Sequence, residues 1–110
     1  MENKTYDGNS EAIEAWNTVL FDKFCRYRDI LTTGLGIHGE TAMDRGELRA
    51  GARVLDVGCG FGDTTLVLAR RVGDTGIATG VDAAERFIEV ARREAKEAGI
   101  HNASFLVADV

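Results

Sequence analysis

Apolar side chains recur every three or four positions through the first third of the chain, which is the spacing of one face of a helix. Ser10 precedes this stripe as a candidate N-cap, and Gly34 lies where the helix should stop. The spacing predicts a single long helix that packs its apolar face against the rest of the domain. The alternative is a lid that touches a ligand. The stripe consists of Ile13, Trp16, Leu20, Phe24, Tyr27 and Leu31.

From residue 51 onward, short apolar runs alternate with helical patterns, and glycines separate them. Strands that alternate with helices are typical of a parallel sheet built with right-handed crossovers and covered by helices. The sequence therefore predicts an α/β fold, with residues 1–50 as an N-terminal helical segment and residues 51–110 as the sheet-forming part. We expect strands at 53–57, 77–81 and 104–107, and helices at 40–48, 63–72 and 84–98.

Composition and charge narrow the possible classes of protein. The chain of 110 residues is 45% hydrophobic and 28% charged, the balance of an ordinary globular domain. Its net charge is -5 and its basic residues are interleaved with acidic ones, so nucleic acid and anionic membranes are not expected partners. No apolar run approaches the roughly 18 residues of a membrane span, and the polar N-terminus lacks the apolar core of a signal peptide. We therefore expect a cytoplasmic location.

The two cysteines are expected to be free thiols. Cys25 falls on a predicted helix and Cys59 in a glycine-rich turn, and neither has a second cysteine or a histidine pair at the spacing of a metal site. No metal is therefore predicted, and a disulfide between the two is the alternative. His38 and His101 fall in predicted turns and are expected at the surface.

The candidate chemistry begins at the glycine-rich turn. Gly58, Gly60 and Gly62 lie between the first predicted strand and the helix that follows it. Glycines let a ligand approach the backbone there, and N–H groups at the start of the helix could point at it. A dinucleotide fingerprint that starts at Gly58 would need a glycine at position 63, where the chain has Asp63. A pyrophosphate would meet that carboxylate, which disfavours a nicotinamide cofactor.

The segment 56–62, DVGCGFG, resembles the first motif of the Rossmann-like (class I) S-adenosylmethionine-dependent methyltransferases, D/E-x-G-x-G-x-G. The resemblance extends over about 60 residues. Asp82 ends the second predicted strand, where the family has the acidic residue that binds both ribose hydroxyls, and Asp109 follows the third strand, like the family's acidic residue near the adenine. The wider sequence looks most similar to the ubiquinone/menaquinone-biosynthesis type of small-molecule methyltransferase.

The resemblance implies a role for each matching residue. The glycines should line the methionyl part of S-adenosylmethionine, whose ammonium and sulfonium charges tolerate acidic neighbours. Asp56 should orient the loop or meet the ammonium group through water, Cys59 should matter sterically, and Ala83 should touch the adenine. Alternatives are a helix N-cap for Asp82 and, for Tyr6 and Arg28, closure over the cofactor. The predicted cofactor-binding residues are Asp56, Gly58, Cys59, Gly60, Gly62, Asp82, Ala83 and Asp109.

The family has a seven-stranded sheet in the order 3-2-1-4-5-7-6, so the resemblance implies that this chain supplies a truncated sheet of the first three strands. The complete enzyme would transfer a methyl group to a small-molecule acceptor. This chain alone is expected to be inactive, and its sequence identifies no catalytic residue. Alternatives are a cofactor-binding or folding module without activity, or a nicotinamide-dependent oxidoreductase. The first strand would form an open edge, with Val54, Leu55 and Val57 on an uncovered apolar surface, so we expect a homo-oligomer, most simply a homodimer. The alternative is that the helix from Glu11 to Leu31 covers this edge.

Overall fold

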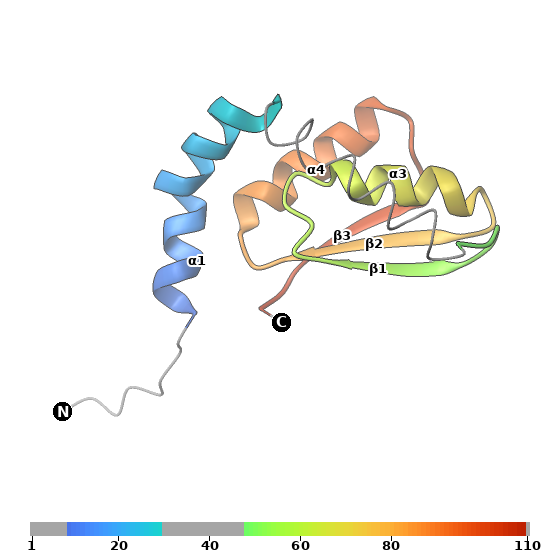
Figure 1. Cartoon of the computed structure of the whole chain (residues 1–110), viewed down its shortest axis with the longest axis horizontal. Helices are drawn as coiled ribbons and strands as arrows, with labels where there is room; N and C mark the ends of the chain where they lie inside the picture. Colours follow the sequence, from blue (N-terminus) through green and yellow to red (C-terminus); the bar gives the residue numbers. More distant parts are fainter. Residues whose placement is uncertain (1–8, 30–47, 110) are drawn as a thin grey trace.

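The structure, a computed structural model, describes residues 9–29 and 48–109. It consists of a three-stranded parallel sheet, two helices that lie on one face of the sheet, and a helical segment beside one end of it (Figure 1). The α/β class and the alternation of strands and helices are therefore confirmed. The elements in chain order are α1 (Ser10–Asn17), β1 (Arg53–Val57), α3 (Asp63–Val72), β2 (Ile77–Asp82), α4 (Glu85–Glu97) and β3 (Ala103–Val107).

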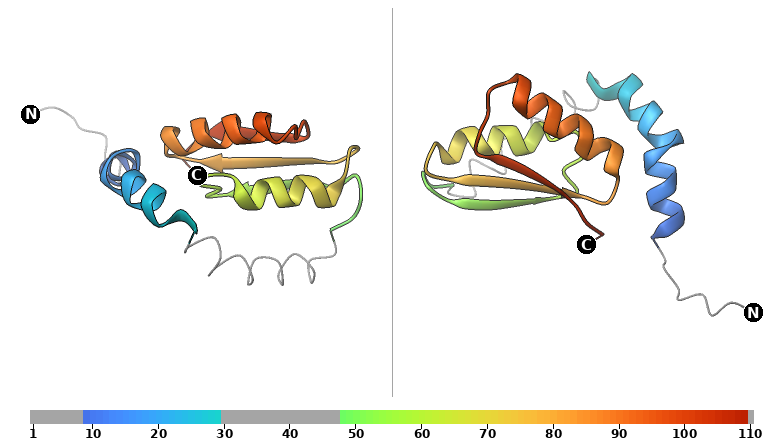
Figure 2. Two further views of the ribbon diagram at one scale, coloured as in Figure 1. Left: turned by 90° about the horizontal axis from the view of Figure 1, so that it is seen from above. Right: turned by 180° about the vertical axis from the view of Figure 1, so that it is seen from behind.

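The sheet has the order β1-β2-β3, so each strand pairs with its neighbour in sequence. Arg53 is the register partner of Ile77 in β2, and Ala78 is the partner of Ala103 in β3. Two successive right-handed crossovers in the same direction place both connecting helices on the same face. Figures 1 and 2 show α3 and α4 side by side on that face.

The core lies between the sheet and these two helices. The predicted apolar face of α4 is buried there, with Ile88 and Ala91 fully enclosed against Phe105 of β3. Under α3, Leu68 and Ala69 pack against Ala78 of β2. Side chains alternate between the two faces of a strand, so the same strands present their other residues away from the helices.

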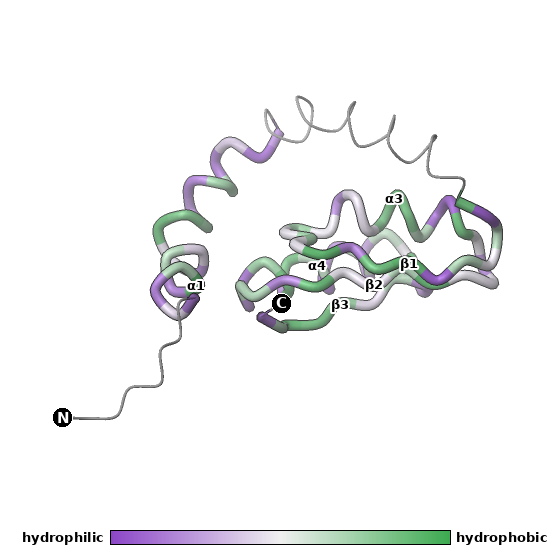
Figure 3. Tube along the Cα trace, turned by 60° about the horizontal axis from the view of Figure 1, so that its bottom comes forward, coloured by the Kyte–Doolittle hydropathy of each residue, from purple (hydrophilic) through white to green (hydrophobic). Residues whose placement is uncertain are grey.

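The opposite face of the sheet carries exposed apolar side chains. Leu55 and Val57 of β1 are 62% and 58% exposed, and Leu106 of β3 is 53% exposed. Figure 3 shows hydrophobic positions along β1 and β3. We expected Val54 to share this uncovered surface, and that prediction was wrong: Val54 points to the helix side and packs against the cluster under α3, because neighbouring positions in a strand face opposite ways.

The single long N-terminal helix is interrupted. Helix α1 ends at Asn17, Thr18 has φ -121° and ψ -98°, and residues 19–29 are helical again. The Thr18 hydroxyl donates to the carbonyl oxygen of Glu14 at 2.8 Å, a local bond of the kind that bends helices. The N-cap is Asn9 rather than the predicted Ser10.

The described N-terminal residues lie beside the end of the sheet and do not cover β1. Phe21, which the predicted stripe omitted, is buried against Phe61 and Phe87, and Trp16 makes edge-to-face contacts with Phe24 and Phe87. The predicted packing role is therefore confirmed for Trp16 and Phe24, whereas Tyr27 of the predicted stripe is 50% exposed. Within the described parts of the chain, no helix is long and apolar enough to cross a membrane. The predictions for Tyr6, His38 and most of the helix at 40–48 lie outside the described residues.

Candidate cofactor-binding site

The glycine-rich loop follows β1 and is anchored to the end of β2. The amides of Gly58 and Cys59 both donate to the carbonyl oxygen of Val81, at 2.7 and 3.0 Å. Gly60 has φ 55° and Gly62 has φ 83°, left-handed conformations that β-branched residues rarely adopt. The loop is therefore held in one conformation before helix α3 begins.

Within the loop itself, most backbone amides are already hydrogen-bonded to the protein. The amide of Gly60 donates to Asp82 at 3.0 Å, and that of Gly62 donates to the carbonyl oxygen of Cys59 at 3.0 Å. Four of the five backbone amides of residues 58–62 are therefore bonded within the protein. A ligand can instead approach Gly58, where an added Cβ would meet no atom within 4 Å.

Asp82 links the loop to the start of α4. Its Oδ2 accepts the bond from Gly60, and its Oδ1 accepts one from the amide of Ala84 at 2.9 Å. The N-cap residue of α4 is Ala84, so Asp82 stands two positions before the cap instead of forming it. Each carboxylate oxygen has a second lone pair, which leaves room for hydroxyl donors of a ligand. Ala83, between the two residues, is partly exposed.

Asp56 points into the protein from β1. The Thr65 hydroxyl, completely buried in α3, donates to Oδ2 of Asp56 at 2.6 Å. Burial raises the pKa of Asp56, the Thr65 hydrogen bond opposes that rise, and the nearby charge of Asp82 adds to it. This geometry fits an Asp56 that orients the loop from below.

Cys59 fills a gap in the core beside the loop. Its side chain packs against the cluster of Ile88, Ala91 and Phe105. Burial, followed by the charges of Asp82 and Asp56, raises the pKa of the Cys59 thiol to about 12. The thiol therefore stays protonated at neutral pH, in agreement with the predicted steric role. Cys59 and Cys25 are both free thiols, as predicted.

Asp109 completes the group at the same edge of the sheet. The carboxyl ends of parallel strands meet at one edge, and the amide of Ala108 donates to the carbonyl oxygen of Asp82 at 3.0 Å. Asp109 is exposed, and its Oδ1 accepts a bond from the Asn9 side-chain amide at 2.6 Å. The structure thus gathers the loop, Asp82 and Asp109, and it adds Asn9, which no local pattern identified.

Gly80 was missed by the sequence analysis. A Cβ at this position of β2 would come within 2.8 Å of Cys59 Sγ and of Thr65 Oγ1. Only a glycine lets both side chains pack under the loop. A glycine inside a predicted strand often marks such a close approach, and this signal was present in the sequence.

Asp63 and Arg28 face each other and not a ligand. Arg28 Nη2 lies 2.8 Å from Oδ1 of Asp63, so the carboxylate that we expected to repel a pyrophosphate is paired with a cation. Arg28 also binds Glu94 of α4 at 2.6 Å. Both bonds direct the guanidinium toward α3 and α4, which does not match the alternative that Arg28 closes over the cofactor.

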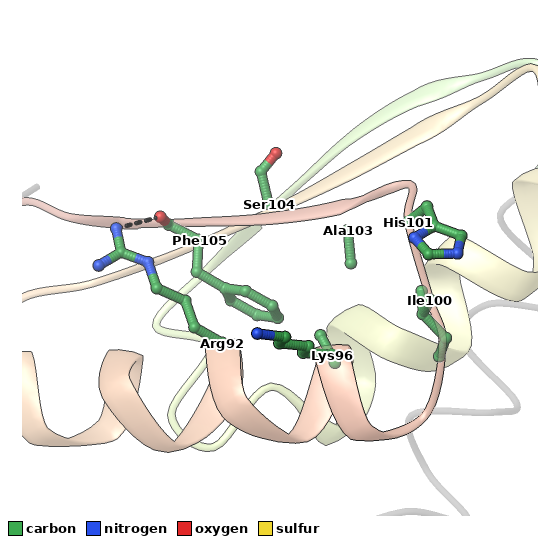
Figure 4. Close-up of a pocket in the computed structure, with 8 residues that line it drawn as sticks. Arg92, Lys96, Ile100, His101, Ala103, Ser104 and Phe105 are labelled. Carbon is green, nitrogen blue, oxygen red and sulfur yellow. Dashed lines mark hydrogen bonds between the residues drawn. The ribbon is translucent and has the colours of Figure 1, made fainter.

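A groove of about 440 Å³ lies elsewhere, between α4 and the outer edge of β3 (Figure 4). Its lining includes Arg92, Lys96 and the exposed His101, and Arg92 donates to the carbonyl oxygen of Phe105 at 2.7 Å. None of the predicted site residues lines this groove. The candidate cofactor site is therefore formed by the loop and the strand ends, and this groove is separate from it.

Comparison with known proteins agrees with the fold and the loop. The chain matches the family model described as "Methyltransferase domain" over residues 48–110. It is 44% identical over 71 residues to the aklanonic acid methyltransferase DauC of Streptomyces sp. (strain C5), which covers 64% of this chain and 32% of DauC. It is 41% identical over 69 residues to the 23S rRNA (uracil(1939)-C(5))-methyltransferase RlmD of Acinetobacter baylyi, covering 63% and 15%. A demethylmenaquinone methyltransferase of Listeria welshimeri is 37% identical over 59 residues, covering 54% and 25%.

Solved structures show the same fold. A SAM dependent methyltransferase from Aquifex aeolicus superposes with a TM-score of 0.61 at 28% identity, over 64% of this chain and 38% of that one. The magnesium protoporphyrin IX methyltransferase ChlM from Synechocystis, at 21% identity, shares the fold with a TM-score of 0.73, over 94% of this chain and 52% of that one. The chain spans about a third or less of the length of the curated relatives named above. The family match covers more than half of the chain and includes the loop and the sheet, and the chain therefore belongs to the class I S-adenosylmethionine-dependent methyltransferases.

Proposed function

We propose that this chain forms the cofactor-binding part of an S-adenosylmethionine-dependent methyltransferase that acts on a small-molecule acceptor. The observation that carries the proposal is the convergence of the glycine loop, Asp82 and Asp109 at one edge of the sheet. Ligands of open α/β sheets bind at this edge, outside the carboxyl ends of the strands.

The residues at this edge fit S-adenosylmethionine. The open space at Gly58 would take the methionyl part, Asp82 would accept the ribose hydroxyls, and Ala83 and Asp109 would lie beside the adenine. The carboxylates of Asp56, Asp82 and Asp109 give the site a negative potential that suits the positive ammonium and sulfonium groups. A nicotinamide cofactor, with its pyrophosphate, would meet the same charges unfavourably.

The bound cofactor would supply an activated methyl group for direct displacement by an acceptor. The residues of this chain would bind and orient it: Asp82 fixes the loop through the Gly60 amide, and Thr65 fixes Asp56 from below. Positioning of this kind is the main source of catalysis in a displacement that needs no covalent intermediate. None of the described residues is assigned as a base.

Two relatives support a small-molecule acceptor, because the names of DauC and of the Listeria enzyme give aklanonic acid and demethylmenaquinone as their substrates. RlmD is named for a ribosomal RNA substrate, which supports the other possibility. The net charge of -5 with interleaved charges favours the small molecule, since RNA binding requires a basic surface. We also propose a cytoplasmic location.

We further propose that two copies associate through the edge of β1. Within the described residues β1 pairs only with β2, and its exposed Leu55 and Val57 adjoin the unpaired edge. An open edge beside an apolar surface favours pairing with a second chain. The described N-terminal residues lie at the end of the sheet and leave this edge uncovered.

Calorimetric titration with S-adenosylhomocysteine, and with NADH in parallel, tests the proposed function. Saturable binding of S-adenosylhomocysteine with no response to NADH is expected. Binding of NADH in its place would overturn the proposal. If binding occurs while methyl transfer to candidate acceptors is absent, the chain acts as a binding module only.

A further inference from the structure

Arg28 connects the N-terminal segment to two helices of the sheet-forming part. Its Nη1 and Nη2 donate to the two oxygens of Glu94, both at 2.6 Å. Nη2 also donates to Oδ1 of Asp63 at 2.8 Å, and the side chain of Arg28 is 23% exposed. One guanidinium therefore holds a carboxylate of α3 and a carboxylate of α4 together, as only its planar fork of donors allows.

The same guanidinium lies over the loop residue Phe61. The central carbon of the Arg28 guanidinium is 4.4 Å from the centre of the Phe61 ring, a cation–π contact. Phe61 stands between Gly60 and Gly62 and is only 7% exposed, with its ring centre 4.7 Å from that of Phe87. The loop thus contributes one aromatic side chain to a buried cluster that also contains Phe21 of the N-terminal segment.

Asp63, the first residue of α3, directly follows Gly62. Arg28 therefore contacts both the loop, by stacking on Phe61, and the start of α3, by an ion pair with Asp63. The loop is fixed from the cofactor side by Asp82, through the amide of Gly60. Arg28 fixes it through Phe61 and through Asp63 at the start of α3.

We propose that Arg28 is a positioning residue for the cofactor loop, and that docking of residues 9–29 and binding of the cofactor are thermodynamically coupled through it. The proposal deepens the proposed function and rests on it for the identity of the ligand. Arg28 acts through its contacts with Phe61 and Asp63. Because coupling is reciprocal, a docked segment tightens cofactor binding and a bound cofactor tightens docking.

Replacement of Arg28 by methionine keeps much of the apolar length of the side chain and removes the charge. The N-terminal segment then loses its ion pairs to Asp63 and Glu94, which are left without the cation that both bind, so the segment should undock from the loop. Arg28→Lys should restore part of the effect, because an ammonium can satisfy one carboxylate but cannot form the two-oxygen fork with Glu94. Arg26→Met is the matched control, since Arg26 is exposed on the same helix.

The first measurements need no ligand. Trp16, the only tryptophan in the sequence, packs on Phe87 and reports docking by its fluorescence. In Arg28→Met we expect a red-shifted emission together with faster hydrogen exchange at the amides of Gly60 and Gly62, while Arg26→Met matches the unchanged protein. Unchanged exchange at both amides in a variant with shifted emission would overturn the positioning role.

The second measurement is the affinity for S-adenosylhomocysteine. We expect Arg28→Met to weaken it about tenfold, the effect of losing one charge-assisted hydrogen bond, and Arg28→Lys to lie between that variant and the unchanged protein. Equal affinity in all three would overturn the coupling. If the unchanged protein does not bind the ligand, the proposed function fails, whereas the exchange data still decide the role of Arg28.

Discussion

Oδ2 of Asp82 accepts the amide hydrogen of Gly60 at 3.0 Å, and this bond joins the ends of two neighbouring strands within the candidate site. The residue predicted to bind the ribose also fixes the loop predicted to bind the methionyl group. One carboxylate therefore has two roles, and substitutions at position 82 should affect both.

Asp82→Ala should weaken S-adenosylhomocysteine binding by about 1.5–3 kcal/mol, the range for hydrogen bonds to a charged group. Asp82→Asn retains one carbonyl oxygen, so it should keep the bond to either Gly60 or Ala84 and lose less affinity. Calorimetry on samples with unchanged circular dichroism measures both. An unaltered dissociation constant in folded Asp82→Ala would rule out a ribose contact.

Gly60→Val should abolish ligand binding before it abolishes folding. Gly60 has φ 55°, and the nearest atom to an added Cβ is in the Phe87 ring at 3.8 Å, so the conformation and not the space is limiting. Gly60→Asn is the control, because asparagine tolerates a left-handed conformation far better than valine. Thermal unfolding and calorimetry on the same samples separate the effects. Equal affinity in both variants would show that the ligand is indifferent to this conformation.

Asp56→Asn should lower the affinity for the ligand without lowering the stability of the fold. Burial raises the pKa of Asp56 in the folded state, so its contribution to stability is fully present below the unfolded pKa and is lost as pH rises through the folded pKa. At neutral pH the asparagine variant should therefore be at least as stable as the unchanged protein, with a flatter pH dependence. Its affinity for S-adenosylhomocysteine should fall if Asp56 meets the ammonium group. Thermal unfolding between about pH 4 and 8 gives the stability profile.

Acid should release the N-terminal segment through Glu94. Arg28 lowers the pKa of Glu94, mainly by hydrogen bonding, so the stabilisation is present above the ordinary glutamate pKa and disappears as pH falls through the lowered value. Asp63, bound to the same arginine, and Arg93 share this environment. Trp16 fluorescence should show an acid transition that Glu94→Gln lacks. The same transition in both proteins would assign it to another carboxylate.

The proposed association through β1 should depend on its exposed apolar residues. Val57→Lys places a charge beside the edge and should convert a dimer to a monomer in sedimentation experiments at micromolar concentration. Val19→Lys is the matched control, because Val19 is 61% exposed on the N-terminal segment. If the protein without substitutions sediments as a monomer of 11.9 kDa, the proposal is contradicted.

The elements from residue 51 onward could be predicted almost to the residue because their signals are local. Strand β1 and helix α3 have the predicted bounds. Gly73 and Gly99 follow the ends of α3 and α4, as expected. Contacts that depend on distant parts of the chain could not be predicted. The bond from Asn9 to Asp109 spans a hundred positions, and the pairing of Arg28 with Glu94 spans 66.

The interruption at Thr18 shows a second limit. A periodic apolar stripe records which face of a helix is buried, but it does not record a hydroxyl that bonds back to the preceding turn. Similarly, the glycines predicted a close approach to the backbone, while the partners of the loop amides depend on the carbonyl of Val81 and the carboxylate of Asp82. Pattern predicts the position of a loop and not the bonds that it makes.

The order β1-β2-β3 has a consequence for how the chain acquires its structure during synthesis. Arg53 pairs with Ile77 and Ala78 pairs with Ala103, so every strand pairing closes a loop of about 25 residues or fewer. Short loops cost little entropy, and topologies with local contacts fold fast. We expect residues 51–109 to fold as a unit as soon as they leave the ribosome, and pulse-labelling hydrogen exchange should then show the three strands, α3 and α4 protected in a single early phase.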